Sequence, residues 1–481
     1  MTTVIRNADY VVAFDGQKHR LIQGGDVAYD GNTITYVGKK YTGNFAKEIS
    51  GSGRMVMPGL INTHGHATSE ALKKGVLEDR GARRLGMSGL YDSVATVGPV
   101  SPEDKHIALN VGLTEMLKSG CTTVLEEGSH DVDTVEVVAA TGIRAYTTRA
   151  YNAGMWYTTT GTRVDYDLDE ARGEENFAKT LDFIDKVNGT HNDRIRSLLS
   201  PHAPDTCPPS LIQKTREYAD KLNLPVHVHA SQSVVEFDHI MRTYGQTPVE
   251  YLHANGLSGP DVMYGHCIFT NDHPWIQFVD ARDFELIVET NTTVDYAPWV
   301  FGRRGIIMYN FAKYIDAGVN VSLGTDSFPQ DMMEAMRFAA IFTKNAERDP
   351  WRGTSAQVFN AATLGGAKAL GRDDLGRISV GAKADLVLVD LNTLHMRPIH
   401  DPIKSLVFSA TSKAVDTVIV DGEIVVEGRE IKTVNEAELI PQLQAASERA
   451  VEAAFPGKDY LGRQFHEANP LAFDVWDGPD A

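Results

Sequence analysis

Cysteine is scarce in this sequence, with 3 residues among 481. The three are far apart, so they form neither a disulfide framework nor a C-x-x-C metal-binding pair. No apolar run is long enough to cross a bilayer, and the first residues lack the basic and apolar regions of a signal peptide. We therefore expect a protein of the reducing cytoplasm with no membrane partner.

Basic residues are also under-represented. Lys and Arg total 46 against 64 Asp and Glu, which gives a formal net charge of −18. A surface of this sign repels nucleic-acid phosphates and anionic headgroups, so neither is an expected partner. The composition, 42% hydrophobic and 23% charged, is ordinary for a globular protein with a sizeable core. At this length we expect one large and one smaller domain, in a homodimer or a higher homo-oligomer.

Two β-rich segments bracket the rest of the chain. Residues 1–57 contain short alternating runs separated by turns such as Asp30-Gly31, and the same pattern returns over 379–430 with an Asp421-Gly422 turn. Neither segment can bury an apolar face alone, so we expect the two to form one β unit. The tail, residues 431–481, contains one predicted amphipathic helix over 435–454.

Residues 58–378 alternate buried-looking strands with amphipathic helical stretches. This alternation is typical of a parallel sheet, and eight strand–helix units close a (β/α)₈ barrel of the TIM type in an α/β protein. Helices are predicted over 101–119, 208–223 and 331–347. The eight strands are expected to begin near Met55, Cys121, Gly142, Arg194, Leu224, Val262, Phe284 and Val319.

Four potential metal ligands follow predicted strands. They are His64 and His66 after the first, His229 after the fifth and Asp326 after the eighth. The strand ends of a barrel share one face, where active sites lie, and alternate residues of His64-Gly65-His66 point the same way. The His227/His229 pair leaves open which imidazole faces that site, and Asp326 could instead cap a helix. Imidazoles and a carboxylate suit zinc or iron.

Other side chains at strand ends are candidates for substrate contact or catalysis. His266 ends strand six and His202 ends strand four, although each alone is more often a structural histidine. Trp156 could stack on a flat ring or simply pack in the fold. Side chains that could shape specificity follow the first, second, third and eighth strands, namely Glu70, His130, Arg149 and Gln330.

These motifs resemble those of the amidohydrolase superfamily, in the branch of S-adenosylhomocysteine and guanine deaminases and triazine hydrolases. The resemblance covers nearly the whole chain. It rests on the segments 56–66, Gly120-Cys-Thr-Thr-Val124, Pro201-His-Ala-Pro204, Gly265-His-Cys267, Leu323-Gly-Thr-Asp326 and Gly381-Ala-Lys-Ala-Asp-Leu386.

The resemblance implies a barrel with a small β-sandwich assembled from both chain ends. It also implies one divalent metal ion, zinc or else iron, because no lysine ends strand four to bridge a second ion. The implied ligands are His64, His66, His229 and Asp326. The resemblance makes His266 the water-orienting and His202 the substrate-contacting histidine.

One position departs from the family's pattern. In His229-Ala-Ser-Gln232 a glutamine stands where this branch carries a proton-shuttling glutamate. A glutamine amide can hydrogen-bond a substrate but cannot carry a proton. Asp326 is then the expected proton carrier.

The expected activity is hydrolysis of a C–N bond in a small polar N-heterocycle. A bound cation lowers the pKa of its water from about 15.7 to about 7, which supplies hydroxide as the nucleophile. Deamination is the first hypothesis. Hydrolysis of a cyclic amide or lactam and dechlorination of a triazine-type ring are alternatives. A non-catalytic scaffold is disfavoured because the full ligand set is present.

Overall fold

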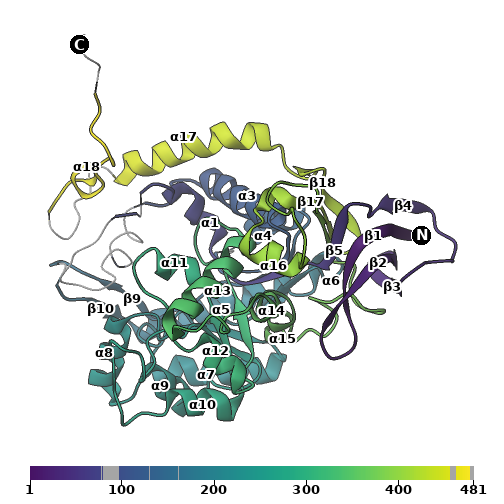
Figure 1. The fold of residues 1–481 in the computed structure, drawn as a ribbon. Coiled ribbons are helices and arrows are strands. Elements are labelled where there is room, and N and C mark those ends of the chain that lie inside the picture. The colour runs from purple at the N-terminus through teal and green to yellow at the C-terminus, as the bar shows by residue number, and fades with distance from the viewer. Residues whose placement is uncertain are drawn as a thin grey trace.

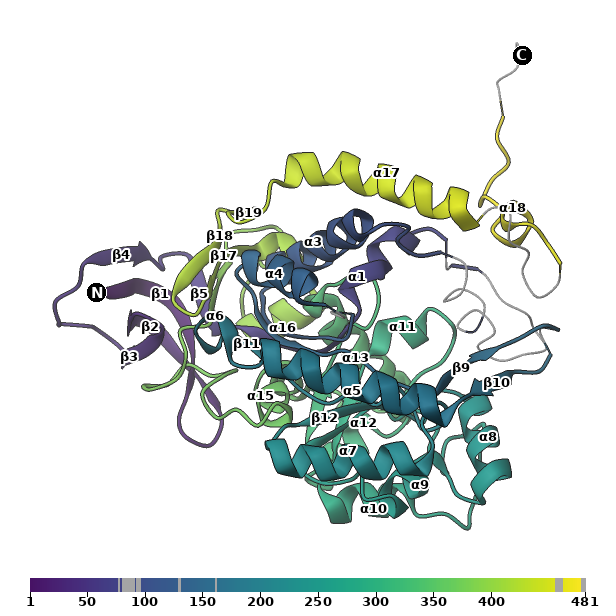
Figure 2. The same ribbon diagram turned by 180° about the vertical axis from the view of Figure 1, so that it is seen from behind.

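The structure is a computed structural model, which describes residues 1–76, 78–79, 91, 97–128, 131–160, 162–454 and 462–476. Figures 1 and 2 show two parts that lie side by side. One is a sheet built from both ends of the chain, and the other is a barrel surrounded by helices. No helix within the described ranges is long and apolar enough to cross a membrane.

The sheet joins the two ends of the chain through one central pair of strands. The order across it is β19-β18-β17-β16-β5-β1-β2-β3, and β4 pairs with β1. β16 runs antiparallel to β5, with Leu388 opposite Val56. The strands are β1 (Thr2–Phe14), β2 (His19–Asp30), β3 (Thr33–Gly38), β4 (Lys47–Ser50), β5 (Arg54–Pro58), β16 (Leu386–Asp390), β17 (Val415–Val420), β18 (Glu423–Glu427) and β19 (Glu430–Ile431).

Both ends of the chain contribute to one apolar core in this sheet. Ile5 and Val27 from the N-terminal strands lie in the same buried cluster as Leu386 and Ile419 from the C-terminal strands. Neither segment could enclose this core alone, because each supplies only part of its residues. The predicted small β domain assembled from both chain ends is confirmed.

The barrel consists of two four-stranded parallel sheets. Their orders are β11-β8-β7-β6 and β12-β13-β14-β15. Parallel bridges between Leu199 and Val226 and between Gly65 and Asp326 join the two sheets at both edges, so the strands form a closed (β/α)₈ barrel, as predicted. The strands are β6 (Leu60–Gly65), β7 (Cys121–Glu126), β8 (Arg144–Thr147), β11 (Ile195–Ser197), β12 (Val226–Ala230), β13 (Val262–His266), β14 (Thr293–Tyr296) and β15 (Val321–Leu323).

Two strand predictions were wrong. The run near Phe284 is a helix, α10 (Asp283–Thr290), and the seventh strand is β14, which follows it. A short apolar run looks the same in a buried strand and in a helix, so periodicity alone cannot separate them. Met55 lies in β5 of the terminal sheet, and the first barrel strand begins at Leu60.

The predicted helices are present, and one of them covers the loop after the first barrel strand. They are α3 (Pro102–Lys118), α7 (Pro209–Leu222), α13 (Met332–Glu347) and the tail helix α17 (Glu436–Ala454). Leu439 and Ala446 of α17 pack in one cluster with Leu72, beside the short helix α1 (Ala67–Glu70). The tail therefore supports a loop that carries candidate site residues.

A buried arginine fixes the terminal sheet against the barrel. The Arg144 side chain on β8 is 1% exposed, and its Nε donates to Asp385 at 2.8 Å while Nη2 donates to Asp421 at 2.6 Å. Both aspartates belong to the C-terminal part of the sheet. This contact between a guanidinium group and two carboxylates holds the terminal sheet against the barrel.

Candidate active site

The candidate ligands lie where the barrel strands end, and the backbone there is unusual. His266 and Asp326 have φ angles of 75° and 60°, in the left-handed region that non-glycine residues seldom adopt. Such conformations cluster at functional sites, where the surrounding structure holds them. Gly324 allows β15 to approach β6 closely, because a Cβ atom at this position would lie 2.4 Å from Cβ of His64.

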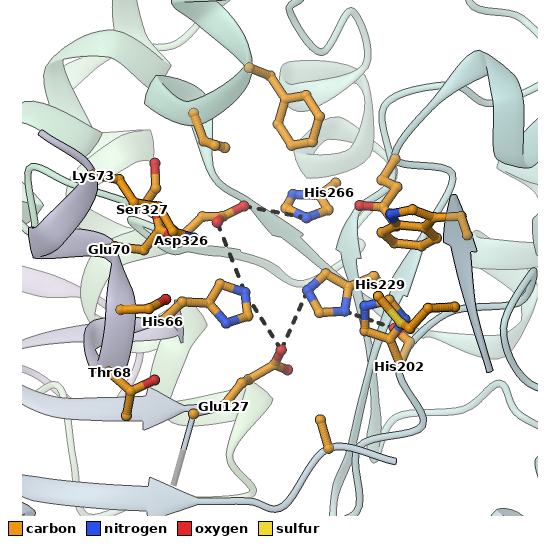
Figure 3. Close-up of a pocket in the computed structure, with 18 of the residues that line it drawn as sticks. His66, Thr68, Glu70, Lys73, Glu127, His202, His229, His266, Asp326 and Ser327 are labelled. Carbon is orange, nitrogen blue, oxygen red and sulfur yellow. Dashed lines mark hydrogen bonds and ion pairs between the residues drawn. The ribbon is translucent and has the colours of Figure 1, made fainter. Parts of the chain in front are cut away.

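Three imidazoles converge on one point, as Figure 3 shows for two of them. His64 ends β6 and is fully buried, and its Nε2 lies 3.2 Å from Nε2 of His66. His229 on β12 donates from Nδ1 to the carbonyl of His202 at 2.7 Å. This bond leaves the lone pair of Nε2 directed at the cluster, the arrangement seen in metal-binding histidines.

Burial keeps His64 and His229 neutral, which is the form that binds a metal ion. Desolvation lowers the pKa of His229 to about 4, despite the nearby carboxylate of Glu127. It also lowers the pKa of His64 well below its usual range, and the neighbouring His266 and His227 contribute in the same direction.

Asp326 faces this cluster from the end of the eighth strand. Its Oδ2 lies 3.5 Å from Nε2 of His266 and 3.9 Å from Nε2 of His64 (Figure 3 draws the first contact). Burial raises the pKa of Asp326 to about 6, while the electrostatic interaction with His66 opposes the rise. A carboxyl group with this pKa can take and release a proton near neutral pH.

Behind the cluster, His227 lies between the buried carboxylates of Glu127 and Asp295, an arrangement that the sequence did not predict. His227 Nδ1 contacts Oε1 of Glu127, and its Nε2 lies 3.6 Å from Oδ2 of Asp295. Asp295 also lies 3.7 Å from Nδ1 of His64. Burial alone would lower the pKa of His227, but the carboxylates of Glu127 and Asp295 outweigh it and raise that pKa to about 10. His227 thus lies buried between two carboxylates. Of the His227/His229 pair, His229 is the one that lines the cavity.

A cavity of about 350 Å³ opens above the cluster. This volume is at the lower end of the range of about 300–1,000 Å³ for small-molecule sites, which fits one compact substrate. The residues that line it include His66, Glu70, Glu127, Trp156, His202, His229, Gln232, His266, Arg303, Arg304 and Asp326.

Several predicted residues meet in this cavity. The His202 ring lies 5.0 Å from that of Trp156, so two flat groups share one wall. Gln232 is 5% exposed, and its backbone N–H is held by the buried carboxylate of Glu236 at 2.8 Å. Glu70 also lines the cavity, and it is paired with Lys73 at 2.6 Å.

Other predicted contacts lie elsewhere. Gln330 is buried outside the cavity lining, and its Nε2 donates to the backbone carbonyl of Asp326 at 3.2 Å. This bond supports the backbone just after the eighth strand. Arg149 is also absent from the residues that line the cavity. His130 falls outside the described residues.

The cluster fits a divalent cation. Ligand atoms of His64, His66, Glu127 and His229 all lie within 4.8 Å of one another, as do those of His64, His266 and Asp326. Glu127 Oε2 is buried and has no hydrogen-bond partner among the described residues. Leaving such a group unpaired is costly, so a cation between these donors accounts for the arrangement.

The fold and the site together define a metal-dependent hydrolase built on a barrel. A family model for the amidohydrolase family matches residues 55–425, and the chain belongs to this family. The prediction of an enzyme that hydrolyses carbon–nitrogen bonds other than peptide bonds is thereby confirmed.

Known proteins resemble the chain over most of its length. A 5-methylthioadenosine/S-adenosylhomocysteine deaminase of Pelotomaculum thermopropionicum is 31% identical over 436 residues, 89% of this chain and 94% of that protein. An adenosine deaminase from Xanthomonas campestris, solved with bound zinc, is 25% identical with a TM-score of 0.79, over 93% of this chain and 98% of that one. An atrazine chlorohydrolase of Arthrobacter aurescens, also complexed with zinc, is 22% identical with a TM-score of 0.77, over 92% and 100%. This last likeness shows the fold alone.

Proposed function

We propose that this protein is an aminohydrolase that removes an amino group from a small N-heterocycle and uses one divalent cation. The observation that carries the proposal is the convergence of His64, His66 and His229 beside one compact cavity, with Asp326 3.9 Å from both His64 and His66. The deaminase names of the relatives favour an amino group as the leaving group over an amide nitrogen or a halide.

The cation would be held by His64, His66, His229 and Asp326. Zinc is our first choice, since neutral imidazoles and a carboxylate suit it, and iron is the alternative. When bound, such an ion polarises water and so supplies the nucleophile at neutral pH.

The protein side chains orient the substrate and move the protons. Asp326 takes a proton from the attacking water and later delivers one to the leaving nitrogen, so that ammonia departs. His266, 3.5 Å from Asp326, is placed to hydrogen-bond the oxygen that attacks the ring. His202 and Trp156 bound one side of the cavity, where a flat ring can stack.

A substrate panel tests this proposal. Amino-substituted purines, their nucleosides, pterins, pyrimidines and triazines are incubated with the zinc-loaded protein, together with cyclic amides and chlorotriazines. Released ammonia and chloride are measured, and products are identified by mass. We expect ammonia and replacement of NH₂ by OH in at least one aminoheterocycle. Ring opening of an amide or release of chloride, without ammonia from any amine, would contradict the assignment.

Gln232 is expected to bind the substrate without carrying a proton. Replacing it by alanine leaves a polar substrate atom unpaired, so kcat/KM should fall by about 5- to 150-fold, the scale of about 1–3 kcal/mol. Gln232→Glu should change the pH profile, because it introduces a second titrating group. The control is Gln213→Ala, on the exposed side of α7, which should match wild type. If Gln232→Ala also has the wild-type kcat/KM, Gln232 makes no contact that stabilises the transition state.

A further inference from the structure

Glu127 lies at the end of the second barrel strand and points into the imidazole cluster. Figure 3 shows its carboxylate between His66 and His229. Its Oε2 lies 3.4 Å from Nε2 of His229 and 3.7 Å from Nε2 of His66. The residue is 2% exposed, so water does not solvate this charge from the surface.

The two carboxylate oxygens of Glu127 have different surroundings. Oε1 contacts Nδ1 of His227 and accepts a hydrogen bond from the Ser200 hydroxyl at 3.2 Å. Oε2 accepts no hydrogen bond from any described residue. The barrel thus holds one oxygen in place and leaves the other free beside two imidazole nitrogens. A buried carboxylate oxygen in this state needs a cation or a strong donor.

The spacing matches that of ligands on one ion. Two donors that each lie about 2.0–2.2 Å from the same cation can be at most about 4.4 Å apart, which is twice the bond length. Both distances from Glu127 Oε2 to the imidazoles fall within this limit. By comparison, Asp326 Oδ1 lies 3.9 Å from Nε2 of His66, so Glu127 is the nearer carboxylate to that imidazole.

We propose that Glu127 is a direct ligand of the cation, in addition to the three histidines and Asp326. The inference rests on the proposed function only in that a cation occupies this cluster. Two carboxylates would balance the charge of a divalent ion, which strengthens its retention. The single free oxygen implies that Glu127 binds through Oε2 alone.

Cobalt substitution and metal affinity test this assignment. The metal-free protein is titrated with Co²⁺ and with Zn²⁺ for wild type, Glu127→Gln and Glu127→Asp. We expect Glu127→Gln to raise the Kd for both ions by about 100-fold or more, which is beyond the range of about 10- to 100-fold that partners outside the ligand shell produce. The visible cobalt absorption should change in shape and intensity because a ligand is lost. Glu127→Asp keeps a carboxylate and should recover part of the affinity.

The neighbouring glutamate provides a matched control. Glu126 is equally buried, but its carboxylate accepts the backbone N–H groups of Ala67 and Gly128, each at 2.9 Å. Glu126→Gln should keep the wild-type cobalt spectrum. Circular dichroism of each variant separates loss of a ligand from loss of the fold.

The outcomes are distinct. A Glu127→Gln protein that is folded, binds cobalt with the wild-type Kd and shows the wild-type spectrum would overturn the assignment. An affinity loss with an unchanged spectrum would also overturn it, because Glu127 would then only position His227 and His229. If wild type binds the metal with these properties but releases ammonia from no substrate, the proposed function fails while the role of Glu127 stands.

Discussion

Replacing Asp326 by asparagine is expected to lower kcat by about 10²- to 10⁴-fold, the contribution of a positioned acid–base group. The asparagine side chain has the size of aspartate and still offers an oxygen atom to the metal ion. It cannot take or release the proton. In the structure no other carboxylate of the described cavity wall contacts both His266 and the imidazole cluster. The loss should therefore persist when the metal site is saturated.

The measurement is kcat of each variant at full metal occupancy, confirmed by elemental analysis. Asp331→Asn is the matched control, because this aspartate accepts the N–H groups of Met333 and Glu334 as the cap of α13 and lies outside the cavity lining. It should retain the wild-type kcat. An Asp326→Asn enzyme with near wild-type kcat would show that the proton is carried elsewhere, and Glu70 and His202 would then be the next candidates.

His227→Ala is expected to reduce the free energy of unfolding of the metal-free protein by about 3–5 kcal/mol. The change leaves Glu127 and Asp295 as buried carboxylates with no cation between them. Removing one partner of a buried ion pair is strongly destabilising because it leaves an uncompensated buried charge. Urea denaturation near pH 6.5 measures the effect. His191→Ala removes a partly exposed histidine that pairs with Glu136 and should cost at most about 1 kcal/mol.

His227 should also make the free energy of unfolding depend on pH. The pKa of His227 rises from 6.5 to about 10 on folding, so the folded protein binds a proton that the unfolded chain releases in this range. The stability from this proton is fully present below pH 6.5 and is lost as the pH rises toward 10. The difference between wild type and His227→Ala should shrink over this window. A difference that stays constant between the two limits would mean that His227 is neutral in the folded protein.

The sequence was sufficient for the architecture because local signals agreed with one another. Asp-Gly turns marked the terminal sheet, and alternation of strands with helices marked the barrel. The seventh strand was the exception, since the apolar run at 284–288 belongs to α10. This error also hid Asp295 on the true strand and Arg303 and Arg304 after it, which the same strand-end argument would have found.

The imidazole cluster could be predicted from the geometry of a barrel, but the position of Glu127 could not be predicted from the sequence. Parallel strands end on one face, so His64, His66, His229, His266 and Asp326 had to meet once their strands were assigned. Glu126 and Glu127 are adjacent, and their pattern does not say which carboxylate turns inward. The structure decides: Glu126 binds backbone N–H groups, whereas Glu127 faces the imidazoles.

The substrate contacts were the least predictable part of the site. Loop side chains near a strand end can face the cavity or support the backbone, and the sequence does not distinguish them. Gln330 shows the second case, since it donates to the carbonyl of Asp326, and Trp156 shows the first, since it lines the cavity.

Ammonia release measured as a function of bound metal tests the central claim most directly. Metal-free protein is titrated with Zn²⁺, and the rate on the best amine substrate from the panel is followed with the metal content of the same samples. We expect no activity without metal, then a linear rise in rate and saturation at about one ion per chain, the count expected for one catalytic site. Full ammonia release by the metal-free protein would contradict this claim.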